Sequence, residues 1–272
     1  MKKLLFIAAA AAGMAAVADI QSANTVGYTG LTIKPGLNMI GTSFFKVDDM
    51  GRFDINATFS DCKGKCVAGD GEGVADNIMV YDASAQSYAA NQFYFYNYPE
   101  SPDPEYDFHW LDSHTDDFRP GGFVIATGNG FWFRHRGDTD IVLTTSGAVG
   151  TEDVQVTLKP GLNMVVNPFP VAFELNDGTI NWKEAGVTAG GGEGVADDIM
   201  VYDATAQSYA ANQYYFYNYP ESPDPEYDFH WLDSHTDDFR PGGANVPVGG
   251  GFWYRHRGDK DITITIKCPL KK

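Results

Sequence analysis

Apolar and polar residues alternate over short runs along most of this chain, and no run keeps an apolar period of 3.6 residues over the length of a helix. The runs, such as residues 78–81 and 131–133, are rich in aromatic and β-branched residues. Gly, Pro, Asn and Asp separate them, which is typical of an all-β sandwich or barrel. Only residues 176–185 are a candidate for a short helix. The pattern therefore predicts an all-β fold.

A Pro-Gly turn occurs twice in the same setting. Lys34-Pro35-Gly36-Leu37-Asn38-Met39 is repeated at residues 159–164. Proline followed by glycine suits the two central positions of a type II turn, where the second position needs a positive φ. Because the flanks are rich in strand-forming residues, each occurrence predicts a β-hairpin.

A much longer repeat organises the chain. Residues 71–122 recur at 192–243 with three changes in 52 positions. The changed pairs are Asn77 and Asp198, Ser84 and Thr205, and Phe93 and Tyr214. The repeat predicts two tandem homologous β domains, at residues 19–148 and 149–272, either separate or packed as one pseudo-symmetric unit.

The identity falls abruptly outside this block, since only nine of the 16 positions in 123–138 match residues 244–259. A duplication of one age does not leave such a step. Recent recombination between the copies explains it without selection. The other explanation is that both copies must present the same surface.

The first 18 residues have the features of a secretory signal peptide. A basic start at Lys2 and Lys3 precedes an apolar run over residues 4–12, and small residues stand at Ala16 and Ala18. The apolar run is shorter than the roughly 20 residues that span a bilayer, and no other segment is apolar enough to do so. We therefore expect a protein that is secreted to the extracellular space or cell surface of a bacterium, or to the periplasm.

The formal net charge of −17 limits the partners. A field of this sign repels phosphate backbones and anionic headgroups, so it argues against nucleic-acid and membrane-surface binding. It suits divalent cations and neutral or cationic partners. High charge also keeps a secreted protein soluble.

Three cysteines are present, too few for a four-cysteine zinc site. In an oxidising compartment Cys62 and Cys66 can close a small loop as a disulfide, which leaves Cys268 single. Cys268 can instead pair with one of them and tie down the C-terminus.

The order of motifs resembles a group of secreted, signal-peptide-bearing repeat β proteins from Verrucomicrobia, Lentisphaerae and Kiritimatiellae. The resemblance rests on the leader, the opening at residues 22–28, the Pro-Gly-Leu-Asn-Met turn, the strand at Val80-Tyr81-Asp82, and Gly-x-Gly-Phe-Trp at residues 128–132 and 249–253. The function of that group is unknown. The resemblance therefore implies a source and a compartment but no site residues.

An acidic, glycine-rich loop opens each copy of the block and is a candidate calcium site, because calcium binds six to eight oxygens in such loops. Its candidate ligands are Asp70, Glu72 and Asp76 in the first copy and Glu193 and Asp197 in the second. The second copy has Gly191 where the first has Asp70. The alternative is an acidic surface turn without metal.

The aromatic residues of the block suggest a carbohydrate platform, because exposed rings stack on sugars while nearby acids bind hydroxyls. The candidates are Tyr94, Tyr96 and Trp110, with Tyr215, Tyr217 and Trp231 in the second copy. The alternative is that these residues fill the sheets.

The basic clusters at residues 134–138 and 255–259 each contain Arg-Gly-Asp, a triplet that also occurs in adhesion motifs. We expect their arginines to pair with the acidic loop at Asp112, Asp116 or Asp117 and to brace it.

These observations favour an exported, non-enzymatic structural or adhesion protein of the cell surface or extracellular matrix, with self-assembly or a surface protein as partner. The alternative is a tandem carbohydrate-binding protein, calcium-assisted and with a glycan as partner. A glycan hydrolase is third, since paired acids serve glycoside hydrolysis. The chain has no catalytic-triad signature, nucleophile elbow or phosphate-binding loop.

Overall fold

The computed structural model describes residues 26–44, 52–88, 92–100, 104–115, 124–210, 213–221, 225–236 and 243–271. The predicted signal peptide at residues 1–18 lies outside these ranges. Within them the protein is nearly all β, with antiparallel strand pairs and a few short helical turns, so the predicted all-β class is confirmed. We call residues 26–148 the first half and residues 149–271 the second half.

Among its described residues, the first half has nine strands, one short α-helix and two 3₁₀ turns (η). They are β1 (Val26–Ile33), β2 (Gly36–Ile40), β3 (Arg52–Asp54), α1 (Ile55–Thr58), η1 (Ser60–Cys62), β4 (Asn77–Met79), β5 (Gln92–Phe95), η2 (Pro104–Tyr106), β6 (Trp110–Asp112), β7 (Val124–Ala126), β8 (Phe131–His135) and β9 (Ile141–Ala148).

The second half repeats this series without a helix in its connecting segment. Its elements are β10 (Val154–Leu158), β11 (Gly161–Val166), β12 (Phe173–Glu174), β13 (Asp198–Val201), β14 (Gln213–Tyr217), η3 (Pro225–Tyr227), β15 (His230–Asp233), β16 (Asn245–Val246), β17 (Gly251–His256) and β18 (Ile262–Ile266). The short helix predicted at residues 176–185 is wrong, because the chain turns there instead.

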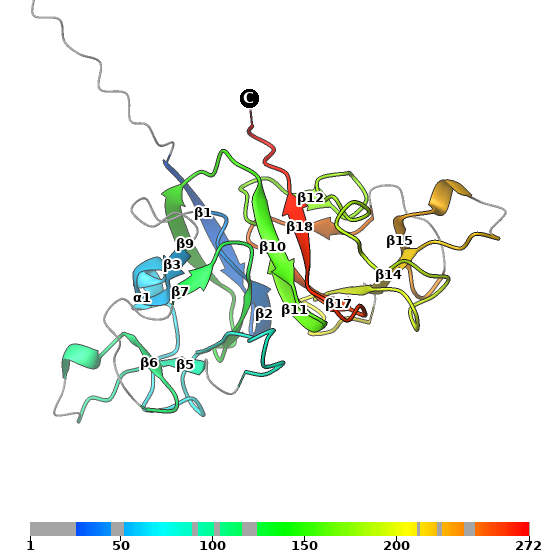
Figure 1. The fold of residues 1–272 in the computed structure, drawn as a ribbon. Coiled ribbons are helices and arrows are strands. Elements are labelled where there is room, and N and C mark those ends of the chain that lie inside the picture. The colour runs from blue at the N-terminus through cyan, green and yellow to red at the C-terminus, as the bar shows by residue number, and fades with distance from the viewer. Residues whose placement is uncertain are drawn as a thin grey trace, which may run out of the picture.

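The two halves have the same sheet topology. The first half has a five-stranded sheet in the order β2-β8-β4-β5-β6, and the second has β11-β17-β13-β14-β15. Two further pairs complete each half: β1 with β9 and β3 with β7, then β10 with β18 and β12 with β16. Figure 1 shows the halves side by side, with η2 and η3 at opposite ends of the molecule.

Each half has its own hydrophobic core between the large sheet and the strand pairs. In the first half Phe93, Trp110 and Phe133 pack with Leu31 and Leu143. An equivalent cluster in the second half is built around Trp182, Trp231 and Tyr254. Alternation along the strands produces these cores, as in β10, where every second side chain is buried.

The Pro-Gly segments form turns, but the predicted hairpins are wrong. Gly36 has φ +89° and Gly161 has φ +93°, as a type II turn requires. However, β1 pairs with β9 while β2 pairs with β8, so the turn joins two different sheets. Asn38 closes it from within, since its side chain accepts from Lys34 N at 2.9 Å and donates to Lys34 O at 2.8 Å.

Candidate functional site

Four of the six aromatic residues predicted to form an exposed platform are buried, so that prediction is wrong for them. Trp110 and Trp231 are 2 % and 0 % exposed and lie inside the cores. Tyr94 and Tyr215 are buried on the opposite face of the sheet, where Ala75 or Ala196 packs on them. The acidic loop folds back over that face, as the bridge between Gly69 and Tyr96 shows.

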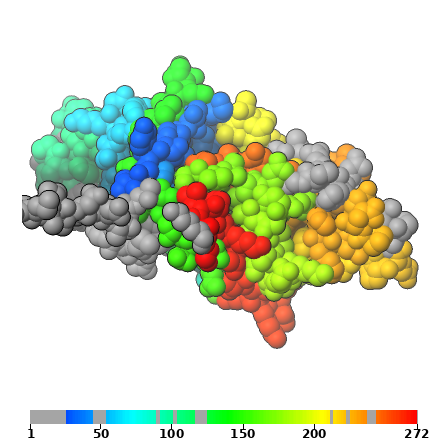
Figure 2. Space-filling view, turned by 90° about the horizontal axis from the view of Figure 1, so that it is seen from above, coloured from blue at the N-terminus to red at the C-terminus, as the bar shows by residue number. Residues whose placement is uncertain are grey.

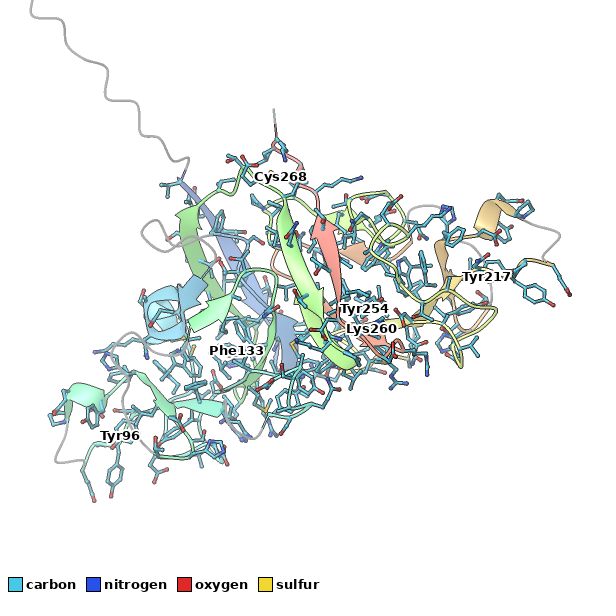
Figure 3. The ribbon with its side chains drawn as sticks, in the orientation of Figure 1. Tyr96, Phe133, Tyr217, Tyr254, Lys260 and Cys268 are labelled. Carbon is cyan, nitrogen blue, oxygen red and sulfur yellow. The ribbon has the colours of Figure 1, made fainter. Side chains whose placement is uncertain are left out.

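Tyr96 and Tyr217 are half-buried and pack at the edges of these outer clusters. Figure 3 places the two residues at opposite ends of the molecule. Tyr96 and Tyr217 do not lie beside Trp110 or Trp231 on an exposed face of the sheet. The structure therefore does not assemble the six predicted aromatic residues into one platform.

The residues proposed as calcium ligands do not converge either. Asp70, Glu72 and Glu193 are exposed, whereas Asp76 and Asp197 are fully buried. Among the residues that the structure describes, no three His, Cys, Asp or Glu side chains are grouped as metal ligands. The predicted calcium site is therefore not assembled at this loop.

Asp76 and Asp197 instead hold the loop to the sheet. The carboxylate of Asp76 accepts from Val67 N at 3.1 Å, Arg136 N at 2.7 Å and His135 Nδ1 at 2.9 Å. The other ring nitrogen of His135 lies 3.1 Å from Thr139 O. This network is structural, and its carboxylate oxygens are already used.

The second half repeats the network with one addition. Asp197 accepts from His256 Nδ1 at 2.9 Å and also from the hydroxyl of Tyr254 at 2.6 Å, where the first half has Phe133. Burial, with the charge of Asp197 beside it, raises the pKa of Tyr254 well above its usual value. The other ring nitrogen of His256 lies 2.9 Å from the carbonyl oxygen of Lys260; Figure 3 labels both Tyr254 and Lys260.

Among the described residues, the arginines of the basic clusters pair with their own loops and not with Asp112, so the expectation is wrong for Asp112. Its other two candidates, Asp116 and Asp117, lie outside the described residues, where the expectation stays a prediction. Arg136 Nε donates to Ala75 O at 2.7 Å, and its Nη2 to Asn77 Oδ1 at 3.2 Å. In the second half the corresponding bond goes from Arg257 Nη2 to Asp198 at 2.7 Å. The arginine of each Arg-Gly-Asp triplet is thus bound to its own loop and is not presented.

The predicted disulfide is absent, because all three cysteines are free thiols. Cys62 is buried in the first core, and its thiol is hydrogen-bonded with that of Cys66. Burial raises the pKa of the Cys62 thiol. Cys268 lies apart from both, against Gly150 of the second half.

The two halves meet through a third apolar cluster, which we call the seam. Its buried members are Met39, Trp132, Met164 and Trp253. Two aromatic contacts cross it with matching geometry. The ring centroids of Tyr81 and Trp253 are 4.8 Å apart at 89°, and those of Trp132 and Tyr202 are 4.8 Å apart at 86°. Edge-to-face pairs of this kind add to the stability that burial gives.

Hydrogen bonds fix the seam tryptophans in place. Trp132 Nε1 donates to the hydroxyl of Tyr88, and Trp253 Nε1 to that of Tyr209, both at 2.8 Å. Burial raises the pKa of Tyr88 to about 12, although the bond from Trp132 opposes this shift. The tyrosines therefore stay neutral over the physiological pH range.

Two glutamines complete the seam by reaching into the opposite half. Gln86 Oε1 accepts from Leu162 N at 2.7 Å, and its Nε2 donates to Leu162 O at 2.9 Å. Gln207 makes the same pair with Leu37, at 2.7 and 3.0 Å. A Cβ at Gly161 would lie 2.4 Å from Gln86 Oε1, so the close approach requires glycine. Each half thus supplies one glutamine side chain and one leucine backbone to a reciprocal pair of contacts across the seam.

Replacing Gln86 or Gln207 by alanine should lower the free energy of unfolding by about 1–2 kcal/mol each, because each change removes two hydrogen bonds across the seam. Urea denaturation measures the loss. Ser84→Ala is the matched control, since its side chain is exposed on the same loop and should have little effect. A difference above about 1 kcal/mol between the two glutamine variants would contradict the reciprocal geometry.

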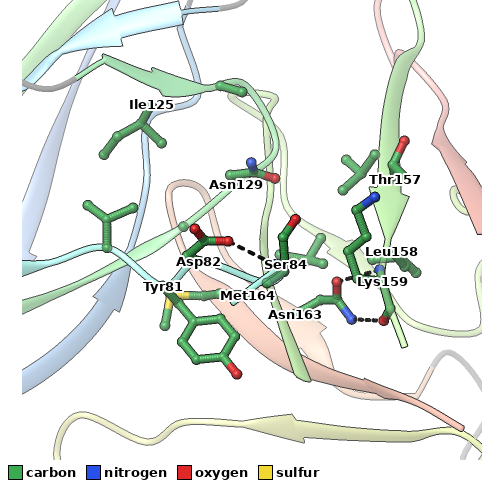
Figure 4. Close-up of a pocket in the computed structure, with 16 residues that line it drawn as sticks. Tyr81, Asp82, Ser84, Ile125, Asn129, Thr157, Leu158, Lys159, Asn163 and Met164 are labelled. Atoms are coloured by element: carbon green, nitrogen blue, oxygen red, sulfur yellow. Dashed lines mark hydrogen bonds between the residues drawn. The ribbon is translucent and has the colours of Figure 1, made fainter. Parts of the chain in front are cut away.

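Two equivalent clefts flank the seam. The first, of about 350 Å³, is lined by Tyr81, Asp82 and Asn129 and by β10 and β11 of the second half (Figure 4). The second, of about 500 Å³, is lined by Tyr202, Asp203 and parts of β1 and β2. Asp82 caps its own turn, accepting from Ser84 N at 2.8 Å. Both clefts form where residues of the two halves meet. Their acids, Asp82 and Asp203, accept hydrogen bonds from the backbone of their own turns.

One exposed segment of the repeated block lies at each far end of the molecule. We call residues 97–100 with 104–109 the first tip, and residues 218–221 with 225–230 the second tip. Tyr98 and Tyr219 are 39 % and 47 % exposed, and the hydroxyl of each lies 3.4 Å from Glu100 or Glu221. Figure 2, turned by 90°, again places the segments around residues 100 and 220 at opposite ends.

Each tip is attached to its half by the same contacts. Phe108 and Phe229 both adopt φ +60°, and each donates its backbone N–H to a tyrosine carbonyl of the neighbouring strand or its end. Lys63 and Lys183 place their ammonium groups 4.4 and 3.8 Å from the centroids of these rings. Because left-handed backbone is unusual for phenylalanine, these contacts fix the orientation of both tips.

No protein-family model matches the chain, and neither a curated protein nor a solved structure is similar to it. No helix among the described residues is long and apolar enough to cross a membrane.

Proposed function

We propose that this is an exported, non-enzymatic structural or adhesion protein of the cell surface or extracellular matrix. The observation that carries the proposal is that one molecule displays the same tyrosine- and glutamate-bearing tip at its two ends. The seam holds the halves through reciprocal hydrogen bonds and aromatic contacts. A molecule of this form can bridge two partner sites, and bivalent attachment raises avidity without new contacts.

The chemistry of the tips favours neutral or cationic partners. Glu100, Glu105 and Asp107 give the first tip its charge, and Glu221, Glu226 and Asp228 repeat it in the second. Neither tip contains a lysine or arginine among its described residues. The acids accept hydrogen bonds from hydroxyl or amine groups, while Tyr98 and Tyr219 offer exposed rings.

We expect wild-type protein to bind and agglutinate particles of the producing cells' envelope or shed matrix. Tyr98→Ala with Glu100→Ala removes the first tip's surface, and Tyr219→Ala with Glu221→Ala removes the second. Either pair alone should preserve binding but abolish agglutination, and all four changes should abolish both. Pull-down and light scattering measure the two effects. Agglutination by a variant with one intact tip, or recovery of the protein only as free monomer from culture fluid, would count against bridging.

A tandem carbohydrate-binding protein is the second candidate, favoured by the exposed Tyr98 and Tyr219 beside Glu100 and Glu221. Calorimetry against a panel of neutral polysaccharides, with and without EDTA, separates the two ideas and tests calcium assistance. Heat of binding that disappears with the tip changes supports this candidate. Absence of heat with every glycan rejects it and leaves a protein partner for the tips.

A further inference from the structure

One of the three differences between the repeated blocks changes the charge around a pair of arginines. In the second half, Asp198 stands opposite Arg255 in the register of β13 and β17. Its carboxylate accepts from Arg257 Nη2 at 2.7 Å and lies 3.7 Å from Arg255 Nη1. Both guanidinium groups therefore have the same carboxylate as their counter-charge.

The first half has the same two arginines without that carboxylate. Asn77 stands opposite Arg134 in the register of β4 and β8. Its amide oxygen accepts from Arg136 Nη2 at 3.2 Å. Within the described ranges, Arg134 has neither an ion-pair partner nor a side-chain hydrogen bond, and its side chain is exposed. The first half thus carries a cationic pair that the second half neutralises.

These side chains line a pocket of about 280 Å³. Its lining residues are Glu72, Gly73, Asn77, Met79, Gln92, Arg134 and Arg136. Burial lowers the pKa of Arg136 and the charge of Arg134 lowers it further, while the charges of Asp76 and Glu72 oppose this shift. The two cations therefore repel each other across the pocket, and an anion placed between them would relieve that repulsion.

Glu72 at the rim does not remove the difference between the halves. Its side chain is exposed, and its contact with Arg136 Nη2 is made by the backbone carbonyl at 2.5 Å. Glu193 holds the same place in the second half and makes the same backbone contact with Arg257. Position 77 is therefore the group that distinguishes the two pockets.

We propose that the pocket around Arg134 and Arg136 binds a single oxyanion group, a sulfate or a carboxylate. The guanidinium of Arg134 and Nη1 of Arg136 donate to its oxygens, since Nε and Nη2 of Arg136 already donate to the loop. The side-chain amides of Asn77 and Gln92 supply neutral donors. The chain's net charge of −17 disfavours long polyanions, so the ligand is one small anionic group, either free or carried on an acidic sugar. This site is separate from the tips and does not rest on their function.

The test is a titration of the full-length protein with sodium sulfate and with sodium glucuronate, with ionic strength held constant by sodium chloride. NMR of the arginine Nε–Hε groups reports the occupied site. We expect saturable shifts of Arg134 and Arg136 with one site per chain. Saturation by sulfate alone assigns a sulfate group, and saturation by glucuronate assigns a carboxylate. Failure of both probes to saturate these signals would overturn the proposal.

The two halves supply matched variants for each other. Asn77→Asp introduces the residue that the second half already has, and it should weaken binding at least tenfold. Asp198→Asn makes the reverse change and should create a second site of similar affinity at Arg255 and Arg257. Near-UV circular dichroism checks that both variants keep the fold. Unchanged affinity in Asn77→Asp, or one site per chain in Asp198→Asn, would reject the assignment of position 77. These outcomes are independent of agglutination by the tips.

Discussion

Replacing Trp231 by alanine should lower the free energy of unfolding by about 3–5 kcal/mol, the usual cost of removing a large buried aromatic residue. The indole is 0 % exposed and packs against Trp182 and Phe216, with both centroid distances at 5.1 Å. Trp110→Ala should cost a similar amount, because Trp110 lies 5.3 Å from Phe95 and 5.5 Å from Phe133.

Urea denaturation followed by circular dichroism measures both losses. Tyr219→Ala is the control, since that ring is 47 % exposed and its removal should change stability by less than about 0.5 kcal/mol. Trp231→Phe should cost less than Trp231→Ala, because it leaves a smaller cavity. A loss below about 1 kcal/mol for Trp231→Ala would mean that the ring is not part of the core, and would restore it as a platform residue.

Replacing Asp197 by alanine should cost about 3–5 kcal/mol, because it leaves several buried donors without their carboxylate. Thr188 N, Arg257 N, His256 Nδ1 and the hydroxyl of Tyr254 all donate to Asp197. The loss should appear as a lower urea midpoint. It should also appear as faster exchange of the backbone amides at Thr188 and Arg257, whose acceptor is gone.

Two substitutions separate this effect from simple loss of charge. Tyr254→Phe introduces the residue found at Phe133, and it should cost about 1–3 kcal/mol, the value of one hydrogen bond to a charged group. Asp261→Asn removes an exposed acid paired with Lys159 and should cost less than about 1 kcal/mol. If Asp197→Ala lowered the free energy of unfolding no more than Asp261→Asn, Asp197 would not stabilise the fold. It would then again be a candidate metal ligand.

The repeated block also supplies residues that join the two halves at the seam, and the sequence does not show this directly. Gln86 lies in a polar loop that reads as an ordinary turn, yet it bonds with Leu162, 76 residues further on. A signal was present, because Leu37, Met39 and Trp132 match Leu162, Met164 and Trp253 although all six lie outside the near-identical block. Some of the residues that match outside the block therefore join the halves.

The amino-acid sequence alone determined the features that depend on local geometry. Alternating short runs specify strands because side chains alternate across a sheet. Pro35-Gly36 specifies a turn because the backbone there needs a positive φ, and the structure has +89° at Gly36. These outcomes need no knowledge of distant residues.

Only the tertiary structure decided which side of each strand faces solvent. Consecutive aromatic residues in β5 point to both faces, and alternation predicts that one face is open. The acidic loop covers that face instead, which buries Tyr94 and turns Asp76 inward toward His135. The sequence alone shows Asn77 where the second copy has Asp198, but only the tertiary structure shows that this position contacts Arg136 or Arg257, where the loop meets β8 or β17. Contacts between residues distant in the sequence fix these arrangements, such as Asp76 and His135 at a separation of 59 positions, so a local pattern does not contain them.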